Sequence, residues 1–274
     1  MSGIAQGHGA GLAYLSRTGG KTPIVLLHGI GSHARSFVPL IEALDPCFSV
    51  VAWDAPGYGG SPPLSIEWPD ASDYAVALNR LLAYLHISRC VLVGHSLGAL
   101  MAARFALVSP NRTIRLCLIS PALGYGAQKD APLPPPAASR LDDLDRLGPE
   151  KLAAKRAPGL LADAQARPEV LQQVERAMAA VRRPGYEQAT RMLAGGRLLE
   201  DAAKISVPTA VLVGAQDRIT PPENVRRVFE ALPKAARLAY GEFAGAGHVI
   251  CQEQPLEVAR AIASIIDSKA TADA

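Results

Sequence analysis

The sequence predicts an α/β protein with a mostly parallel, doubly wound sheet and an inserted helical segment. Short, almost continuous apolar runs recur along the chain, a pattern typical of strands that are buried on both faces. Helix-like segments separate the first of these runs, and this alternation favours an α/β sheet. The alternation stops between about residues 123 and 204, where no convincing strand-like run occurs. One sheet with one all-helical insertion accounts for the three observations.

The predicted strands are β-branched or apolar runs that end in glycine, proline, aspartate or serine. In chain order they are 24–29, 48–57, 90–96, 115–122, 209–217 and, more weakly, 237–243. Glycine and proline are strong punctuators of local structure, so each run is bounded as a strand should be.

Two helices are predicted between the first three runs, over residues 34–44 and 70–86. The second has apolar residues at the spacing of one helix face, namely Ala71, Tyr74, Ala75, Leu78, Leu81, Leu82 and Leu85. Asp70 is placed to cap its N-terminus.

The predicted insertion begins with a proline-rich stretch at 131–139, in which a helix is not expected to start before the last proline. Four amphipathic pieces follow. We therefore expect a core made of residues 1–122 and 205–274 and a helical insertion over 123–204. Its aliphatic side chains are expected mainly to pack it onto the core; they are Leu141, Leu144, Leu147, Leu152, Leu160, Leu161, Met178, Met192 and Leu193.

Composition excludes several classes of function. The net charge is only +3 and no long basic run occurs, which disfavours a nucleic-acid partner. The four cysteines are scattered without a CxxC pair, so neither a zinc site nor a disulfide framework is expected. The first 20 residues lack the pattern of a signal peptide, and no apolar run approaches the roughly 20 residues that span a bilayer. We expect a cytoplasmic protein with no metal, no cofactor and no membrane partner; oligomeric state is not readable from these features.

The most informative stretch is Gly94-His95-Ser96-Leu97-Gly98, which matches the G-x-S-x-G nucleophile elbow. It follows a predicted strand and precedes a good helix, which is the context that the motif needs. Side chains at either glycine would collide with the neighbouring strand and helix. The turn presents the Ser96 hydroxyl, and the N–H groups after it, chiefly that of Leu97, are placed to stabilise an oxyanion.

A serine hydroxyl needs an adjacent base, and the chain offers six histidines. These are His8, His28, His33, His86, His95 and His248. His248 is favoured because it lies in a glycine-rich loop between the last strand-like run and the terminal helix. His95 adjoins the serine and cannot aim its ring at it, whereas His28 and His33 are better suited to shaping the site.

The acid that orients the base is assigned by elimination. Asp217 ends the run 209–217, while Asp54 has turn-rich surroundings and Asp201 lies in the insertion. The order Ser96, Asp217, His248 is that of α/β-hydrolases.

At this point the sequence resembles the α/β-hydrolase superfamily, and in particular its small single-chain esterases, C–C bond hydrolases, enol-lactonases and cofactor-free haloperoxidases. The resemblance rests on five motifs in order: "LLHGIGS", "DAPGYGGSP", "GHSLGA", "GAQDRITPP" and "GAGH". It covers nearly the whole chain except the insertion, which stands where such proteins carry a helical lid. Relatives with an aspartate nucleophile are excluded, because position 96 is serine.

The resemblance implies that the second oxyanion donor is the amide of Ile30, the residue after His-Gly. The alternative is that Gly31, the next residue, is the one at which this loop approaches the site closely. It places Ser32 and His33 among the candidate substrate contacts, with Ile30, Leu97 and unassigned residues of the insertion. Cys251, three residues after His248, is interpreted as a plain buried thiol.

Three functions remain open at this stage. The first is hydrolysis of a small carboxylic ester through an acyl-enzyme on a Ser-His-Asp triad. The second is hydrolysis of another acyl-type bond: a C–C bond of a ring-cleavage diketone, an enol-lactone, an amide or a thioester. The third, non-catalytic ligand binding, is disfavoured because Ser96, Asp217 and His248 are all present.

Overall fold

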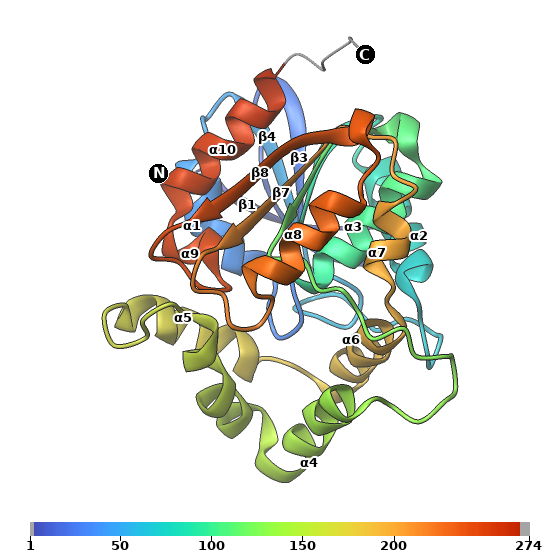
Figure 1. Cartoon of the computed structure of the whole chain (residues 1–274), viewed down its shortest axis with the longest axis vertical. Helices are drawn as coiled ribbons and strands as arrows, with labels where there is room; N and C mark the ends of the chain where they lie inside the picture. Colours follow the sequence, from blue (N-terminus) through green and yellow to red (C-terminus); the bar gives the residue numbers. More distant parts are fainter. Residues whose placement is uncertain (1–2, 269–274) are drawn as a thin grey trace.

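One eight-stranded sheet forms the centre of the molecule (Figure 1). The structure, a computed structural model, describes residues 3–268, so the two ends of the predicted core, 1–2 and 269–274, lie outside it. The strands are β1 (Ala5–Gly9), β2 (Leu12–Arg17), β3 (Lys21–Leu27), β4 (Phe48–Trp53), β5 (Cys90–His95), β6 (Thr113–Ile119), β7 (Thr209–Gly214) and β8 (Arg237–Phe243). Their order across the sheet is β1-β2-β4-β3-β5-β6-β7-β8.

The strands from β3 to β8 are parallel, and only β2 runs against its neighbours β1 and β4. Each of the six predicted runs overlaps one of these parallel strands, including the weak run at 237–243; β3 and β6 start three and two residues before the predicted runs. The sheet is doubly wound, since β4 lies on one side of β3 and β5 on the other, so that the winding direction reverses at β3. The predicted mostly parallel α/β sheet is confirmed.

Two strands, β1 and β2, were not predicted. They form a hairpin at the edge of the sheet, joined by Ala10 and Gly11, both of which have positive φ (52° and 81°). Two central residues with positive φ are typical of the tight turns that match the twist of a hairpin. β1 is short, exposed and glycine-rich, so it lacks the apolar pattern on which the other strands were recognised.

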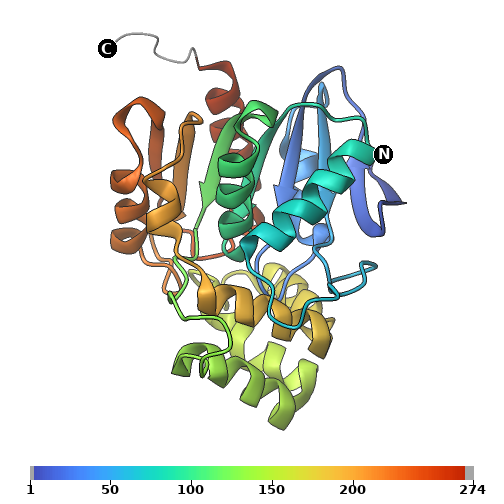
Figure 2. The same cartoon turned by 90° about the vertical axis from the view of Figure 1, so that its right-hand side faces the viewer.

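Helices cover both faces of the sheet. On one face lie α2 (Ala71–Tyr84), α3 (Leu97–Val108) and α8 (Pro222–Ala231), and on the other α1 (Val38–Ala43), α9 (Ile250–Glu253) and α10 (Pro255–Asp267) (Figures 1 and 2). Short 3-10 helices are η1 (Ala34–Phe37), η2 (Pro110–Arg112), η3 (Ala157–Leu160) and η4 (Lys234–Ala236). Asp70 caps α2 by accepting from the N–H groups of Ser72 and Asp73, as predicted.

Between β6 and β7 the chain forms only helices among its described elements: α4 (Pro135–Arg156), η3, α5 (Pro168–Ala179), α6 (Arg183–Gly195) and α7 (Leu198–Ala202). α4 starts one residue before the last proline, because prolines are tolerated in the first turn, and it kinks at Gly148 (φ 72°). α7 packs on α3 and α8, whereas α4, α5 and α6 lie beyond the carboxyl ends of the strands (Figures 1 and 2).

Candidate active site

Ser96 occupies a strained turn between β5 and α3. Its backbone has φ 54° and ψ −115°, a conformation that non-glycine residues rarely adopt. A Cβ on Gly94 would overlap the carbonyl of Gly98, and one on Gly98 would overlap that of Leu27. The two glycines therefore let β5, α3 and β3 approach closely enough to hold the serine in this turn.

The structure brings Ser96, His248 and Asp217 together from three separate loops. His248 Nε2 lies 2.9 Å from Ser96 Oγ, and His248 Nδ1 lies 2.9 Å from Asp217 Oδ2. The three residues are 6, 4 and 3% exposed, so this chain of hydrogen bonds is shielded from water. A hydroxyl, an imidazole and a carboxylate in this order form the arrangement in which the imidazole can take the hydroxyl proton.

Asp217 is kept ionised by its surroundings. Burial raises the pKa of Asp217, but the charge of His248 and hydrogen bonds from His248 and Thr220 outweigh it and hold the pKa below its ordinary value. Oδ1 accepts from the N–H groups of Ile219 (2.8 Å) and Thr220 (2.9 Å). The carboxylate can therefore accept the Nδ1–H of His248 and fix the ring tautomer.

Thr220 was missed by sequence reasoning. Its Oγ1 lies 2.8 Å from Asp217 Oδ2, 3.3 Å from His248 Nδ1 and 3.1 Å from the carbonyl of Ser120. The only signal was its position three residues after the acid, which by itself is typical of any loop-capping threonine.

His95 and His28 hold the loops around the serine. His95 Nε2 donates to the backbone carbonyl of His248 at 2.8 Å, and burial followed by the charge of His248 lowers the pKa of His95 to about 3. His28 Nε2 accepts from the N–H of Ala55 at 3.0 Å, and burial lowers the pKa of His28 to about 4. Both rings are thus neutral near pH 7, and neither contacts Ser96 Oγ through a hydrogen bond among the described residues.

The predicted oxyanion donors lie beside the serine. Leu97 is the first residue of α3, so its N–H has no acceptor within the helix. Ile30 follows Gly29, and a Cβ on Gly29 would come within 2.9 Å of Ser96 Cβ, which shows how close this loop passes. Gly31 next to it has φ 74° and provides the left-handed turn of the loop. Within residues 3–268, the N–H groups of Ile30 and Leu97 donate to no protein acceptor.

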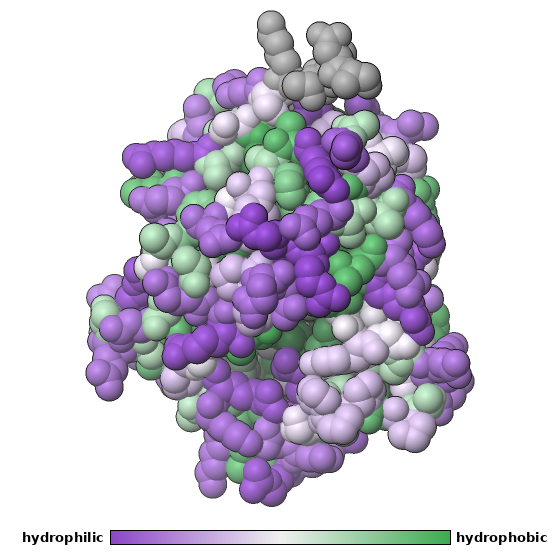
Figure 3. All heavy atoms as spheres, viewed as in Figure 1, coloured by the Kyte–Doolittle hydropathy of each residue, from purple (hydrophilic) through white to green (hydrophobic). Residues whose placement is uncertain are grey.

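Two cavities meet at Ser96. The first cavity has an empty volume of about 890 Å³, including its part open to solvent, and the second about 660 Å³. The first is lined by Gly29, Ile30, Gly31, Ser32, Ser36, Phe37, His95, Ser96, Arg140, Arg156, Leu160, Val174, Ala177, Met178, Ile219, His248, Val249, Cys251 and Gln252. The second is lined by Ile30, Ser96, Leu97, Ala122, Leu123, Gly124, Tyr125, Arg140, Leu193, Ile219, Thr220 and Asn224. The molecular surface is hollowed between the sheet and the insertion, with apolar side chains inside (Figure 3).

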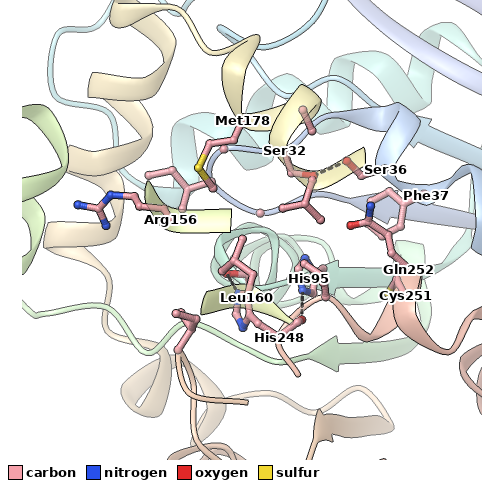
Figure 4. Close-up of a pocket in the computed structure, with 18 of the residues that line it drawn as sticks. Ser32, Ser36, Phe37, His95, Arg156, Leu160, Met178, His248, Cys251 and Gln252 are labelled. Carbon is pink, nitrogen blue, oxygen red and sulfur yellow. Dashed lines mark hydrogen bonds between the residues drawn. The ribbon is translucent and has the colours of Figure 1, made fainter. Parts of the chain in front are cut away.

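Of the candidate substrate contacts, Ser32 lines the first cavity, where its hydroxyl donates to that of Ser36 at 2.8 Å (Figure 4). His33 does not line either cavity at Ser96. Its Nδ1 accepts from the N–H of Arg35 and caps η1, and the residue borders a separate cavity beside Asp54.

Three of the nine aliphatic residues singled out in the insertion, Leu160, Met178 and Leu193, line the two cavities. Cys251 also lines the first cavity, and burial raises the pKa of its thiol to about 12, so it is protonated near pH 7. In the part of the chain that the structure describes, no group of side chains is arranged to hold a metal ion. No helix within residues 3–268 is long and apolar enough to cross a membrane.

Comparison with known proteins identifies relatives over most of the chain. Residues 20–255 match the family model described as "Serine aminopeptidase, S33". The chain is 29% identical over 217 residues to the poly(3-hydroxyalkanoate) depolymerase of Ectopseudomonas oleovorans, covering 78% of this chain and 75% of that one. It is 28% identical over 230 residues to the 2-hydroxy-6-oxononadienedioate/2-hydroxy-6-oxononatrienedioate hydrolase 2 of Pseudomonas putida, covering 79% of each chain.

Among solved structures, the enol-lactonase from Burkholderia xenovorans LB400 superposes with a TM-score of 0.82 at 21% identity, over 96% of this chain and 100% of that one. A likeness at this identity establishes the fold alone.

Proposed function

Because the chain belongs to the serine aminopeptidase S33 family of α/β-hydrolases and is a hydrolase of that fold, we propose that it cleaves a small carboxylic ester through an acyl-enzyme on Ser96. The observation that carries this proposal is the continuous hydrogen-bonded chain from Ser96 Oγ through His248 to Asp217, with 2.9 Å at each step. Residues 123–204 act in this proposal as a lid over the core, since they supply Arg140, Leu160 and Met178 to the cavity at the serine.

In the first half of the reaction, Ser96 Oγ bonds to the ester carbonyl carbon while His248 Nε2 takes the hydroxyl proton. Asp217 accepts the Nδ1–H of His248 and stabilises the imidazolium that forms. The carbonyl oxygen becomes an oxyanion and receives hydrogen bonds from the N–H groups of Leu97 and Ile30. The intermediate then collapses, the bond to the leaving oxygen breaks, and His248 gives its proton to the departing alcohol.

In the second half, a water molecule attacks the acyl-enzyme and His248 accepts one of its protons. Collapse of the second tetrahedral intermediate breaks the bond to Ser96 Oγ, and His248 returns the proton to that oxygen. The acid is released and the enzyme regains its starting state, with no cofactor consumed.

The direct test is the Ser96→Ala variant, assayed with a short-chain 4-nitrophenyl ester. Activity is expected to fall by about 10⁴-fold or more while the protein stays folded, because the nucleophile is lost and the fold is not. Ser264→Ala, which changes an exposed serine of α10, is the matched control and should keep full activity. A serine-directed fluorophosphonate should label the native chain and the control but not Ser96→Ala. Residual Ser96→Ala activity within about tenfold of the native enzyme contradicts the proposal.

A second candidate is hydrolysis of a C–C bond in a ring-cleavage product. It is favoured by the relative from Pseudomonas putida, which is named as a hydrolase of an unsaturated hydroxy-oxo-dicarboxylate. Assaying an ester, a vinylogous diketone and an amide side by side separates the candidates by their kcat/KM values. A diketone turned over faster than every ester would replace the first proposal with the second.

A further inference from the structure

The described residues that line the two cavities at Ser96 include cations but no carboxylate. Apart from the histidines, the charged residues among those that line them are Arg140 and Arg156, both from α4. Most of the remaining lining is apolar, such as Leu160, Val174 and Met178. A positive site in an apolar, partly enclosed cavity attracts an anion strongly, because little water is present to screen it.

Arg156 is already ion-paired. Its Nη2 lies 2.7 Å from Asp143 Oδ2, and Lys155 and Arg146 pair with the same carboxylate. Figure 4 shows the Arg156 guanidinium pointing away from the labelled residues around His248. The guanidinium of Arg156 is therefore engaged in an ion pair within the insertion.

Arg140 has no such partner. Within residues 3–268 no carboxylate forms an ion pair with it, and its buried Nε has no hydrogen-bond acceptor. The residue is half-buried, so water replaces the missing partner only in part. A guanidinium stays charged at all pH values that proteins experience, and burying it without an acceptor is costly. This cost is expected to be recovered when a ligand supplies the acceptor.

Arg140 lines the same two cavities as Ser96, where the reacting carbonyl would bind. Among residues 3–268, four border both cavities: Ile30, Ser96, Arg140 and Ile219. Arg140 thus borders the space that the groups on either side of a carbonyl bound at Ser96 would fill. The planar fork of the unpaired Arg140 guanidinium matches a carboxylate, with which it can form two parallel hydrogen bonds.

From this arrangement we propose that Arg140 selects esters that carry an ionised carboxylate, such as a monoester of a short dicarboxylic acid. The inference rests on the proposed ester hydrolysis and adds the chemical class of its substrate. Arg140 is then a specificity residue that binds the anionic end of the substrate while Ser96 reacts with the ester end.

The test compares two esters of similar length, mono-4-nitrophenyl glutarate, which is anionic, and 4-nitrophenyl pentanoate, which is neutral. In Arg140→Met the ratio of kcat/KM for the anionic to the neutral ester should fall by about 10- to 100-fold, because a charged hydrogen-bonded pair is lost. Arg140→Lys keeps the charge without the fork and should recover part of the ratio. Lys151→Met, which removes an exposed cation of the same helix outside both cavities, is the matched control and should leave the ratio unchanged.

A second pair, 4-carboxyphenyl butyrate and phenyl butyrate, carries the carboxylate on the leaving group instead. The pair whose ratio depends on Arg140 identifies which side of the ester is anionic. If the ratio changes in neither pair, the inference is overturned.

A binding measurement separates this inference from the proposed chemistry. Calorimetric titration of Ser96→Ala protein with monoethyl glutarate should show a Kd at least about tenfold weaker when Arg140→Met is added. Arg140-dependent binding without ester turnover by the native chain upholds the anion site and overturns the proposed hydrolysis. Ester turnover with no binding of the monoester, or with binding indifferent to Arg140, overturns the anion site alone.

Discussion

Thr220 contacts both the carboxylate and the imidazole of the candidate triad with one hydroxyl group. Because Oγ1 carries a single proton, it donates either to Asp217 Oδ2 or to the carbonyl of Ser120, at 2.8 and 3.1 Å. Its backbone N–H adds a second bond to the same carboxylate, at 2.9 Å. Thr220 is therefore a positioning residue that acts through Asp217.

Replacing Thr220 with valine should lower kcat by about tenfold, because valine keeps the shape but removes a hydrogen bond to a charged group. Thr220→Ser, which restores the hydroxyl, should recover most of the loss. Steady-state kinetics on a 4-nitrophenyl ester measures both. If the valine variant keeps full kcat while the serine variant is impaired, the hydroxyl does not act through Asp217 and the β-branched shape is what matters.

Helix α4 is held in its kinked form by charges that lie on both sides of Gly148. Asp143 precedes the kink, and the two residues that pair with it most closely, Lys155 (2.8 Å) and Arg156 (2.7 Å), follow it. The hydrogen bond from Lys155 outweighs burial and, with those from Arg156 and Arg146, lowers the pKa of Asp143 to about 2. The same helix carries Arg140 to the cavities, so its shape bears on the substrate site.

The pairing at Asp143 makes the stability of the protein depend on pH. Since the folded pKa lies below the unfolded value of roughly 3.9, the contribution is complete above pH ~4 and is lost as the pH falls toward 2. Asp143→Asn should therefore lower the free energy of unfolding by about 1–2 kcal/mol at pH 7, and the gap to the native protein should narrow below pH ~4.

Urea unfolding between pH 7 and pH 3 measures this gap. Asp142→Asn, an exposed neighbour on the same helix, serves as the control and should show a small, pH-independent effect. An Asp143→Asn gap that stays constant down to pH 3 contradicts the ion-pair account.

Across the whole molecule, the insertion is tied to the loop of the candidate base through Glu253. The Glu253 side chain is fully buried and accepts from the N–H of Gly247 (2.7 Å), the N–H of Ala162 (2.9 Å) and Arg167 Nη1 (2.8 Å). The backbone N–H of His248 itself donates to the carbonyl of Leu160 at 2.8 Å. The position of His248 therefore depends on where the insertion packs.

Glu253→Gln should weaken this connection, because the new NH₂ group is a donor facing donors. We expect a loss of about 2–4 kcal/mol in the free energy of unfolding and a fall in kcat larger than the change in KM. Urea unfolding and steady-state kinetics give the two values, and Glu257→Gln, exposed on α10, is the matched control. Loss of stability with unchanged kcat would show that Glu253 supports the fold without positioning His248.

Short segments of the chain predict much of the fold. The apolar runs predicted the six parallel strands, and Asp70 predicted the start of α2, because these patterns depend on neighbours within a few residues. Strand β1 was not predicted because glycine and polar residues make this edge strand look like a loop, whereas β2 was missed although Leu12, Ala13 and Leu15 are apolar and buried. Ser96, Asp217 and His248 were predicted as a set, and the structure brings them within hydrogen-bond distance.

Local sequence thus specified the strands, the serine turn and the candidate reacting groups, since each depends on backbone geometry over a few residues. Tertiary packing alone decided that Thr220 touches both partners, that Glu253 joins the insertion to the His248 loop, and that Arg140 lines both cavities at Ser96 with no carboxylate partner among the described residues. It also turned His33 away from the cavity to cap η1. These contacts join segments that are far apart in the chain, or they depend on how a loop folds back. Burial then determines how costly each charged form is. This cost depends on the groups that surround a side chain in space and not on its neighbours in sequence.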